Sequence, residues 1–338
     1  MSNLPFIVAE ISANHQGDFE KAKKLVDYAA SSGADAVKLQ TYRAETMTLN
    51  LDNLKVSKNH ELWSDLKLYD LYAKAMTPWE WHSSLFERAR GLGMTPFSSP
   101  FDRSAVDFLE ELGCQIYKIA SLESGDVDLI AYAASMKKPL IISTGATSLK
   151  EIESALEVAR ANGCPLVTLL VCTSSYPLKA EDAHVLRIQT LMQEFQVPVG
   201  FSDHTLGVGA SIAAVALGAQ TIEKHLTISR LEGGFDSTFS LEPSEFLLLS
   251  KECRFAQQSL GSPNWVEQES ETESRRLRRS LYIVKPVKKG EIATRENVKA
   301  LRPNLGGPIK ELSQILGKRF IKDFEIGTPA NLSCVAFD

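Results

Sequence analysis

The chain has 338 residues, of which 44% are hydrophobic and 23% charged, as is usual for a folded protein with one large domain and a smaller one. Its formal net charge of −5 argues against a nucleic-acid-binding surface, because such surfaces depend on dense lysine and arginine. The sequence has no run of about 18 apolar residues and no signal-like opening segment, so we expect a cytoplasmic protein without a membrane span.

The five cysteines give no sign of cross-links. They are odd in number and show no CxxC spacing, at Cys114, Cys164, Cys172, Cys253 and Cys334. Neither a disulfide framework nor a zinc knuckle is indicated, and we expect reduced thiols.

Eight short apolar runs recur along the first 225 or so residues. In chain order they read PFIVAEI, AVKLQT, MTPFSS, IYKIAS, PLIISTG, VTLLVCT, VPVGFSD and TIEKHL. Amphipathic patterns such as DFEKAKKLVDYAASSG lie between most of them, with an acidic residue or serine near the start and glycine at the end. Eight alternating units predict an α/β fold of the (β/α)8 TIM barrel type. A doubly wound open sheet is the alternative, but no GxGxxG follows the first run.

The character of the chain changes after Leu260. GSPNWVEQESETESRRLRRS is polar and charged with little periodicity, so residues 261–277 are predicted to form a linker. Short strands, turns and one short helix are expected in residues 278–338, which form a second unit after the barrel of residues 1–260. A core of this size is marginal alone, so we expect it to pack on another surface.

Polar residues follow almost every predicted strand. The strand ends carry Glu10, Lys38 with Gln40, Ser98 with Ser99, Lys118 with Ser121 and Glu123, Ser143 with Thr144, Thr173 with Ser174, Ser202 with Asp203 and His204, and Glu223 with Lys224 and His225. Because a barrel places its functional groups at the carboxyl ends of its strands, these residues predict one site. Cations and hydroxyls suit a phosphate or carboxylate, carboxylates suit acid–base chemistry, and a histidine pair suits a metal.

Several of these motifs resemble one known family. IVAEISANHQGD, KLQTY, YKIASLES, ISTGAT, SSYP, GFSDHT, IEKH and ALRPNLGG are similar to motifs of the sialic acid synthase family. Its members join a phosphoenolpyruvate-condensing TIM barrel to a small antifreeze-like (SAF) domain, which would be residues 278–338 here. LYDLYAKAMTPWEWHSSLF, SSPFD and GGFDSTFSLEP resemble the pseudaminic acid synthase branch more than the N-acetylneuraminate branch.

The resemblance implies a reaction. Phosphoenolpyruvate would condense with 2,4-diacetamido-2,4,6-trideoxy-L-altrose and water, giving pseudaminic acid and phosphate with cleavage of the C–O bond of phosphoenolpyruvate. N-acetylneuraminate or legionaminate synthesis, with other acceptor sugars, is the alternative. A non-catalytic relative is a further alternative, which the intact set of histidines, lysines and carboxylates disfavours.

The resemblance also implies roles for individual residues. His204 and His225 correspond to metal ligands, with Mn²⁺ expected and Mg²⁺ or Co²⁺ tolerated. The phosphoenolpyruvate-binding residues would be Lys38, Lys118, Ser121, Ser143, Ser174 and Ser202. Ser174 departs from family members that carry asparagine, although a hydroxyl can still donate to phosphate.

The remaining roles concern the acceptor sugar and the chemistry. Glu123 is expected near the acceptor and Glu10 near the attacking water, although either carboxylate can instead be an ion-pair partner for a lysine. The sugar contacts would be Gln40, Tyr176 and Asp236. Arg302 of the small domain would complete the site of a partner chain in a domain-swapped homodimer.

The insertion between the second and third predicted strands is rich in aromatic residues. LYDLYAKAMTPWEWHSSLF has helical spacing, and Trp79 and Trp81 are predicted to bury a helix against the barrel. A 6-deoxy acceptor with two acetamido groups nevertheless needs an apolar wall, so a contribution of this insertion to the site is the alternative.

Overall fold

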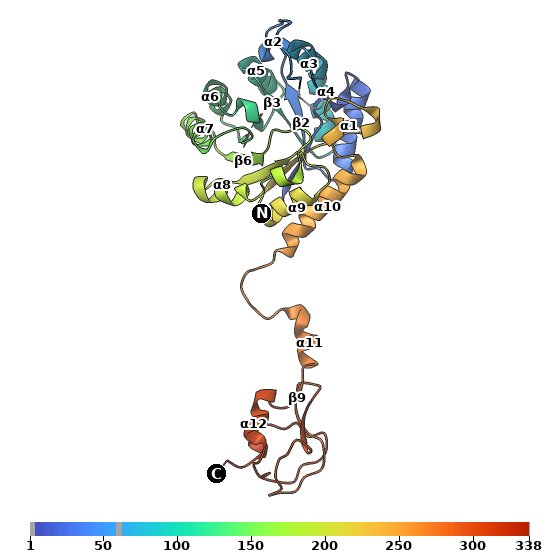
Figure 1. The fold of residues 1–338 in the computed structure, drawn as a ribbon, viewed down its shortest axis with the longest axis vertical. Helices are drawn as coiled ribbons and strands as arrows, with labels where there is room; N and C mark the ends of the chain where they lie inside the picture. The colour runs from blue at the N-terminus through green and yellow to red at the C-terminus, as the bar shows by residue number, and fades with distance from the viewer. Residues whose placement is uncertain (1–3, 59–62, 338) are drawn as a thin grey trace. The chain divides into compact units, whose positions relative to one another are not determined.

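The computed structural model describes residues 4–58 and 63–337, and the chain divides into two compact units, Met1–Gly261 and Ser262–Asp338 (Figure 1). The first unit contains a closed barrel of eight strands in chain order. They are β1 (Phe6–Glu10), β2 (Ala36–Thr41), β3 (Thr95–Pro100), β4 (Tyr117–Ile119), β5 (Leu140–Ser143), β6 (Val167–Cys172), β7 (Val199–Asp203) and β8 (Thr221–His225). Every neighbouring pair is parallel, and β1 pairs with both β2 and β8. The predicted (β/α)8 barrel is confirmed.

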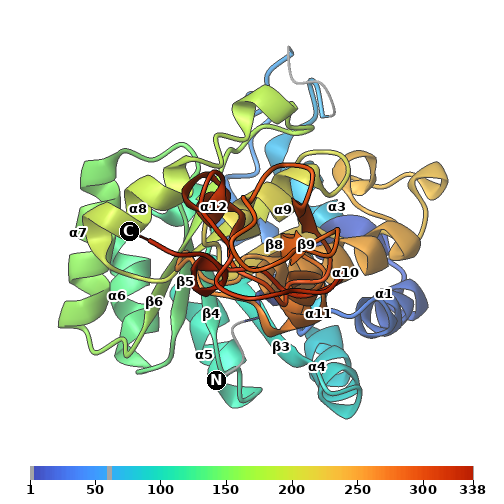
Figure 2. The same cartoon turned by 90° about the horizontal axis from the view of Figure 1, so that it is seen from below.

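Helices surround these strands (Figure 2). They are α1 (Phe19–Ser31), α2 (Ala44–Met47), α3 (Leu68–Ala75), α4 (His82–Gly91), α5 (Arg103–Glu111), α6 (Val127–Ser135), α7 (Leu149–Ala161), α8 (Arg187–Phe195), α9 (Gly209–Ala216) and α10 (Pro243–Ser259). In α1 the buried positions Ala22, Leu25, Val26 and Ala29 follow the helical repeat, and the Asp18 side chain accepts hydrogen bonds from the first turn. None of the helices in the described residues is long and apolar enough to cross a membrane.

The insertion between β2 and β3 contains α2, α3 and a 3-10 turn, Trp79–Trp81. Trp79 stacks on Phe108 of α5 with 4.5 Å between ring centroids, and Trp81 packs on Phe19 of α1 at 5.3 Å. Both tryptophans are half-buried and attach the insertion to the outer helices, from a 3-10 turn and not from the helix that was predicted.

The second unit is a small β structure with its own core. Strands β9 (Ser280–Ile283) and β10 (Val298–Leu301) are antiparallel, and the short helices are α11 (Thr272–Arg276) and α12 (Leu312–Ile315). The core residues include Leu281, Ile283, Val298, Ile315 and Phe320. Arg302 follows β10 and is exposed, next to a carbonyl of Pro303 that accepts hydrogen bonds from the side chains of Ser280 and Tyr282.

Candidate active site

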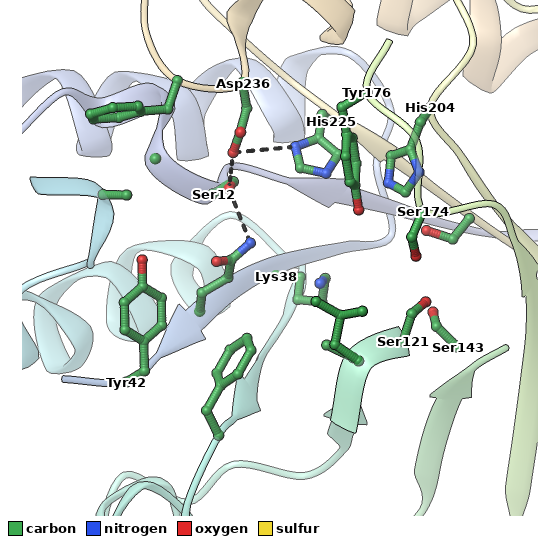
Figure 3. Close-up of a pocket in the computed structure, with 18 of the residues that line it drawn as sticks. Ser12, Lys38, Tyr42, Ser121, Ser143, Ser174, Tyr176, His204, His225 and Asp236 are labelled. Atoms are coloured by element: carbon green, nitrogen blue, oxygen red, sulfur yellow. Dashed lines mark hydrogen bonds and ion pairs between the residues drawn. The ribbon is translucent and has the colours of Figure 1, made fainter. Parts of the chain in front are cut away.

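A cavity of about 390 Å³ opens at the carboxyl ends of the barrel strands (Figure 3). The sequence-predicted residues that line it are Lys38, Gln40, Lys118, Ser121, Glu123, Ser143, Ser174, Tyr176, Ser202, His204, His225 and Asp236. Glu10 is fully buried directly behind Lys38 and is not part of the lining. Arg302 belongs to the second unit, so its expected role stays a prediction.

The alternation of side chains along each strand explains why these residues meet. Lys38 and Gln40 are two positions apart on β2, and Glu223 and His225 are two positions apart on β8. Side chains with this spacing point to the same face, and all four line the cavity. Glu223 was recognised at a strand end but received no role from the sequence, whereas the structure places it at the centre of the site.

The floor of the cavity is a cluster of buried charges. Lys38 forms ion pairs with Glu10 and with Glu223, whose Oε1 lies 3.2 Å from Lys38 Nζ. Lys118 Nζ donates to Ser143 Oγ at 2.6 Å and lies 3.9 Å from Glu223 Oε2. Glu223 thus contacts both lysines. Lys38 Nζ also donates to Ser99 Oγ, and Lys118 Nζ to the Ile119 carbonyl oxygen, both at 3.4 Å.

Burial and mutual charge set the protonation of this cluster. Burial lowers the pKa of Lys38, but the carboxylates of Glu10 and Glu223 outweigh it and hold that pKa above its usual value. Burial and the charge of Lys38 hold the pKa of Lys118 below its usual value. Burial raises the pKa of Glu10, whereas the two lysines outweigh burial and lower the pKa of Glu223. The neighbouring charges thus favour the charged forms of Lys38 and Glu223, whereas burial favours the neutral forms of Lys118 and Glu10.

Hydroxyl groups form a second wall around Gly145. The Ser121 Oγ accepts a hydrogen bond from the Gly145 N–H at 3.2 Å, and the buried Ser174 Oγ has no hydrogen-bond partner in the described part of the chain. A Cβ added at Gly145 would lie 2.7 Å from Ser121 Oγ and closer still to Ser174 Oγ. The absence of a side chain at this glycine leaves room for the two hydroxyls, which with Lys118 and Ser143 fit an anion.

His204 and His225 face each other with 5.4 Å between ring centroids. His204 Nδ1 lies 3.3 Å from the Thr173 carbonyl oxygen, and in the neutral ring whose N–H donates there Nε2 has a lone pair. The buried His225 Nδ1 has no hydrogen-bond partner in residues 4–58 and 63–337, and lies 3.9 Å from Asp236 Oδ2. Burial, aided by His204, lowers the pKa of His225 well below its usual value, so this ring is neutral.

These two imidazoles fit a divalent cation. An unpartnered buried ring nitrogen and a fixed tautomer are what a metal ligand requires. Over the described residues, no group of three or more histidine, cysteine, aspartate or glutamate side chains is arranged to hold a metal. Water or substrate oxygens would therefore complete the coordination.

Comparison with known proteins identifies the family. A model of the NeuB family matches residues 25–264, and a model of the SAF domain matches residues 278–336. The chain belongs to the NeuB family. The resemblance to sialic acid synthases and the SAF domain expected from the sequence are thereby confirmed.

Individual relatives of this NeuB-family chain span nearly its whole length. It is 43% identical over 330 residues to a pseudaminic acid synthase of Helicobacter pylori, covering 97% of each chain. It is 38% identical over 329 residues to an N,N'-diacetyllegionaminic acid synthase of Legionella pneumophila, covering 96% of this chain and 92% of that one. A crystal structure of N-acetylneuraminic acid synthetase from Leptospira borgpetersenii in complex with citrate superposes with a TM-score of 0.73 and 34% identity, covering 81% of this chain and 91% of that one. These similarities confirm an enzyme of the sialic acid synthase type.

A series of hydrogen-bonded side chains lies on the side of the cavity opposite Ser121, Ser143 and Ser174 (Figure 3). Gln40 Nε2 donates to Ser12 Oγ at 3.0 Å, and the Ser12 hydroxyl donates to Asp236 Oδ2. Ser12 has a positive φ of 40°, an uncommon conformation for a residue other than glycine. The sequence reasoning missed Ser12, although the ISAN motif that contains it was among the resemblances.

Glu123 ends a 3-10 turn, Ser121–Glu123, directly after β4. Burial raises the pKa of its carboxyl group, and the charge of Lys118 only partly opposes this. Glu123 is therefore more readily protonated than an exposed glutamate, whereas the two lysines favour the ionised form of Glu223.

The insertion supplies an apolar wall to the cavity. From the insertion, Met47 of α2 and Leu71, Tyr72 and Ala75 of α3 line the cavity. Phe101, which follows β3, lies in the same lining. Trp79 and Trp81 do not line the cavity, whereas other residues of the insertion do. Packing against the barrel and lining the site thus fall to different residues of the insertion. The tryptophans anchor the insertion, and α2 and α3 reach the site.

Proposed function

We propose that this protein condenses phosphoenolpyruvate with 2,4-diacetamido-2,4,6-trideoxy-L-altrose and water, giving pseudaminic acid and phosphate. The observation that carries the proposal is one cavity with an anion pocket, a histidine pair and an apolar wall. The higher identity to a pseudaminic acid synthase (43%) than to a legionaminic acid synthase (38%) favours this acceptor over the alternatives.

Phosphoenolpyruvate would lie on the lysine and serine side. Lys118, Ser143 and Ser174 would donate to its phosphate, and Ser121 and Ser202 lie in the same wall. Lys38 is held by Glu10 and Glu223, and its fixed charge would face the developing negative charge of the substrate. Glu10 would act through Lys38, by setting the charge and position of that lysine, and not by contacting the attacking water.

The acceptor would lie between the histidines and the insertion. His204 and His225 would hold a divalent cation, for which Mn²⁺ is the best candidate and Mg²⁺ or Co²⁺ alternatives; such a cation supplies polarisation of a carbonyl oxygen. Glu123 would deliver a proton to the acceptor oxygen as the C–C bond forms, because burial favours its protonated form. Asp236, Gln40 and Tyr176 would contact the sugar.

The apolar wall supports a deoxy sugar. A methyl group at C6 and two acetyl methyl groups need contacts with side chains such as Met47, Leu71 and Ala75. An acceptor with a hydroxymethyl or glycerol group would strand hydroxyls against this wall, at a cost of about 1–3 kcal/mol for each unmet hydrogen bond.

A homodimer is part of the proposal. The core of the second unit is small, so packing on a partner barrel would stabilise it. The exposed Arg302 would then reach the partner's acceptor or a carboxylate and form paired hydrogen bonds.

Product analysis tests the proposal. The full-length protein is incubated with phosphoenolpyruvate, Mn²⁺ and each of three acceptors: the altrose derivative, N-acetylmannosamine and the legionaminate precursor. Mass spectrometry should find the nine-carbon keto acid with the altrose derivative, with kcat/KM at least about tenfold above that for N-acetylmannosamine. Equal use of N-acetylmannosamine would reassign the acceptor, and no product with any sugar would refute the enzyme proposal.

The bond that breaks is tested with labelled solvent. In H₂¹⁸O the released phosphate should contain no solvent oxygen, because water attacks carbon 2 and the C–O bond breaks. Phosphate that carries ¹⁸O would indicate attack at phosphorus.

A further inference from the structure

A buried ion pair lies behind the two histidines. Lys224 Nζ is 3.0 Å from Asp203 Oδ2, and both side chains are 0% exposed. The two residues are register partners on β8 and β7, and each directly precedes a histidine of the cavity, His225 and His204. Since side chains alternate along strands, the pair faces the surrounding helices while the histidines face the cavity.

The pair is the centre of a hydrogen-bond network around His204. Asp203 Oδ1 accepts from the backbone N–H and the hydroxyl of Thr205, both at 2.8 Å, and Oδ2 accepts from Ser211 of α9 at 2.7 Å. Lys224 Nζ donates to the carbonyl oxygen of Thr205. The residue after His204 is therefore held at its hydroxyl, its N–H and its carbonyl, and the whole assembly is fixed to a helix.

Stability alone does not explain such a pair. Removing two charges from water costs several kcal/mol per ion, and well-packed apolar residues at buried pairs are often as stable or more stable. A buried pair that links two strands in register instead favours one relative position of those strands. The relative position of β7 and β8 sets the distance and orientation of the His204 and His225 rings, whose centroids are 5.4 Å apart.

We propose that the Lys224–Asp203 pair is a positioning device for the histidine pair, which sets both imidazoles for one divalent cation. The inference rests on the metal site in the proposed function. Groups that orient metal ligands without touching the metal typically contribute about 10–100-fold to metal affinity. Loss of the pair should therefore weaken metal binding by this factor and leave the phosphoenolpyruvate pocket intact.

The test is the double variant Asp203→Asn/Lys224→Met in the full-length protein. It removes both charges at nearly constant volume, so neither charge is left buried alone. Mn²⁺ affinity is measured from the electron paramagnetic resonance signal of free Mn²⁺, and phosphoenolpyruvate affinity by calorimetry in EDTA. We expect Mn²⁺ affinity to fall about 10–100-fold, with phosphoenolpyruvate affinity and thermal stability in EDTA near wild type. Wild-type Mn²⁺ affinity in the double variant would overturn the proposal.

A matched control removes another ion pair of the barrel. Lys138 Nζ and Glu110 Oε1 are 2.6 Å apart, and neither residue lines the cavity. Glu110→Gln/Lys138→Met should bind Mn²⁺ like the wild type, and an equal loss in this control would also overturn the proposal. If the first double variant does not fold, Thr205→Val keeps the ion pair and removes one donor to Asp203. It should lower Mn²⁺ affinity several-fold, and unchanged affinity would again overturn the proposal.

A separate measurement distinguishes this inference from the metal site itself. Wild-type protein should bind Mn²⁺, and His204→Ala should not. If the two are equal, the metal site of the proposed function is wrong. If they differ and the Asp203→Asn/Lys224→Met variant binds normally, only the positioning role is wrong.

Discussion

Substitution of Gly145 by alanine should damage phosphoenolpyruvate binding through two hydroxyl groups. The new Cβ would lie 2.7 Å from Ser121 Oγ and closer still to Ser174 Oγ, where carbon and oxygen atoms in contact need more than 3 Å. Both hydroxyls must therefore move by roughly 0.5–1 Å, out of hydrogen-bond geometry. Each hydrogen bond to a charged group contributes about 1.5–3 kcal/mol, so the loss of both is about 3–6 kcal/mol.

The assay is the kcat/KM for phosphoenolpyruvate at saturating acceptor. A loss of 3 kcal/mol corresponds to about 100-fold, and we expect at least this decrease. Gly125→Ala is the matched control, because among the described residues no atom beyond its chain neighbours lies within 4 Å of its added Cβ, and it follows Glu123 at the same end of the barrel. It should retain wild-type kinetics. A Gly145→Ala enzyme within twofold of wild type would refute the reasoning.

A rescue experiment separates steric displacement from misfolding. In a Ser121→Ala/Ser174→Ala background the hydroxyls are already absent, so adding Gly145→Ala should cost far less than it does in the wild type. This non-additivity is expected when one substitution acts through the others. A full additional loss of about 100-fold would show that Gly145 acts by another route.

EDTA should abolish turnover and Mn²⁺ restore it, and His204→Ala should fold normally without binding Mn²⁺; full activity in chelator would exclude the metal. Glu123→Gln should lower kcat about 10²–10⁴-fold at unchanged thermal stability, whereas a kcat within threefold of wild type would remove Glu123 from the chemistry. Burial lowers the pKa of His82 from 6.5 to about 4, so the unfolded chain gains a proton that the native chain does not. Through His82 alone, the free energy of unfolding should therefore fall by about 1.4 kcal/mol for each unit by which the pH is lowered from about 6.5 to about 4. Urea titrations of His82→Gln over this pH range should show a shallower fall. Co-refolded Glu123→Gln and Arg302→Ala chains, each inactive alone, should recover about a quarter of sites if Arg302 acts in the partner's site; activity of Arg302→Ala alone would end that proposal.

Much of the barrel and its site could be predicted because strand periodicity is local. The apolar runs correspond to all eight barrel strands, and the two-residue spacing of Lys38 and Gln40 places both in the cavity. The carboxyl ends of parallel strands meet at one end of a barrel, so polar strand ends predicted a single site before any contact was known.

Other features depend on contacts between distant residues. Glu223 holds two lysines from β2 and β4, and a strand-end glutamate gives no sign of which cations it meets. Ser12 contacts both Gln40 and Asp236, and Asp236 lies 224 positions further along the sequence than Ser12. For Gly145, only the positions of the two serine hydroxyls explain why no side chain fits there.

The two sides of the cavity come from different stretches of the chain. Lys118 and the serines of the proposed anion pocket lie on or shortly after β4 to β7, with Lys38 added from β2. Met47, Leu71 and Ala75 belong to the insertion between β2 and β3, which Trp79 and Trp81 attach to the outer helices. Under the proposed function, substitutions in this insertion should change which sugar is accepted and leave the phosphoenolpyruvate pocket unchanged. One wall of the cavity can thus vary in sequence without any change in the barrel strands that carry the charged groups.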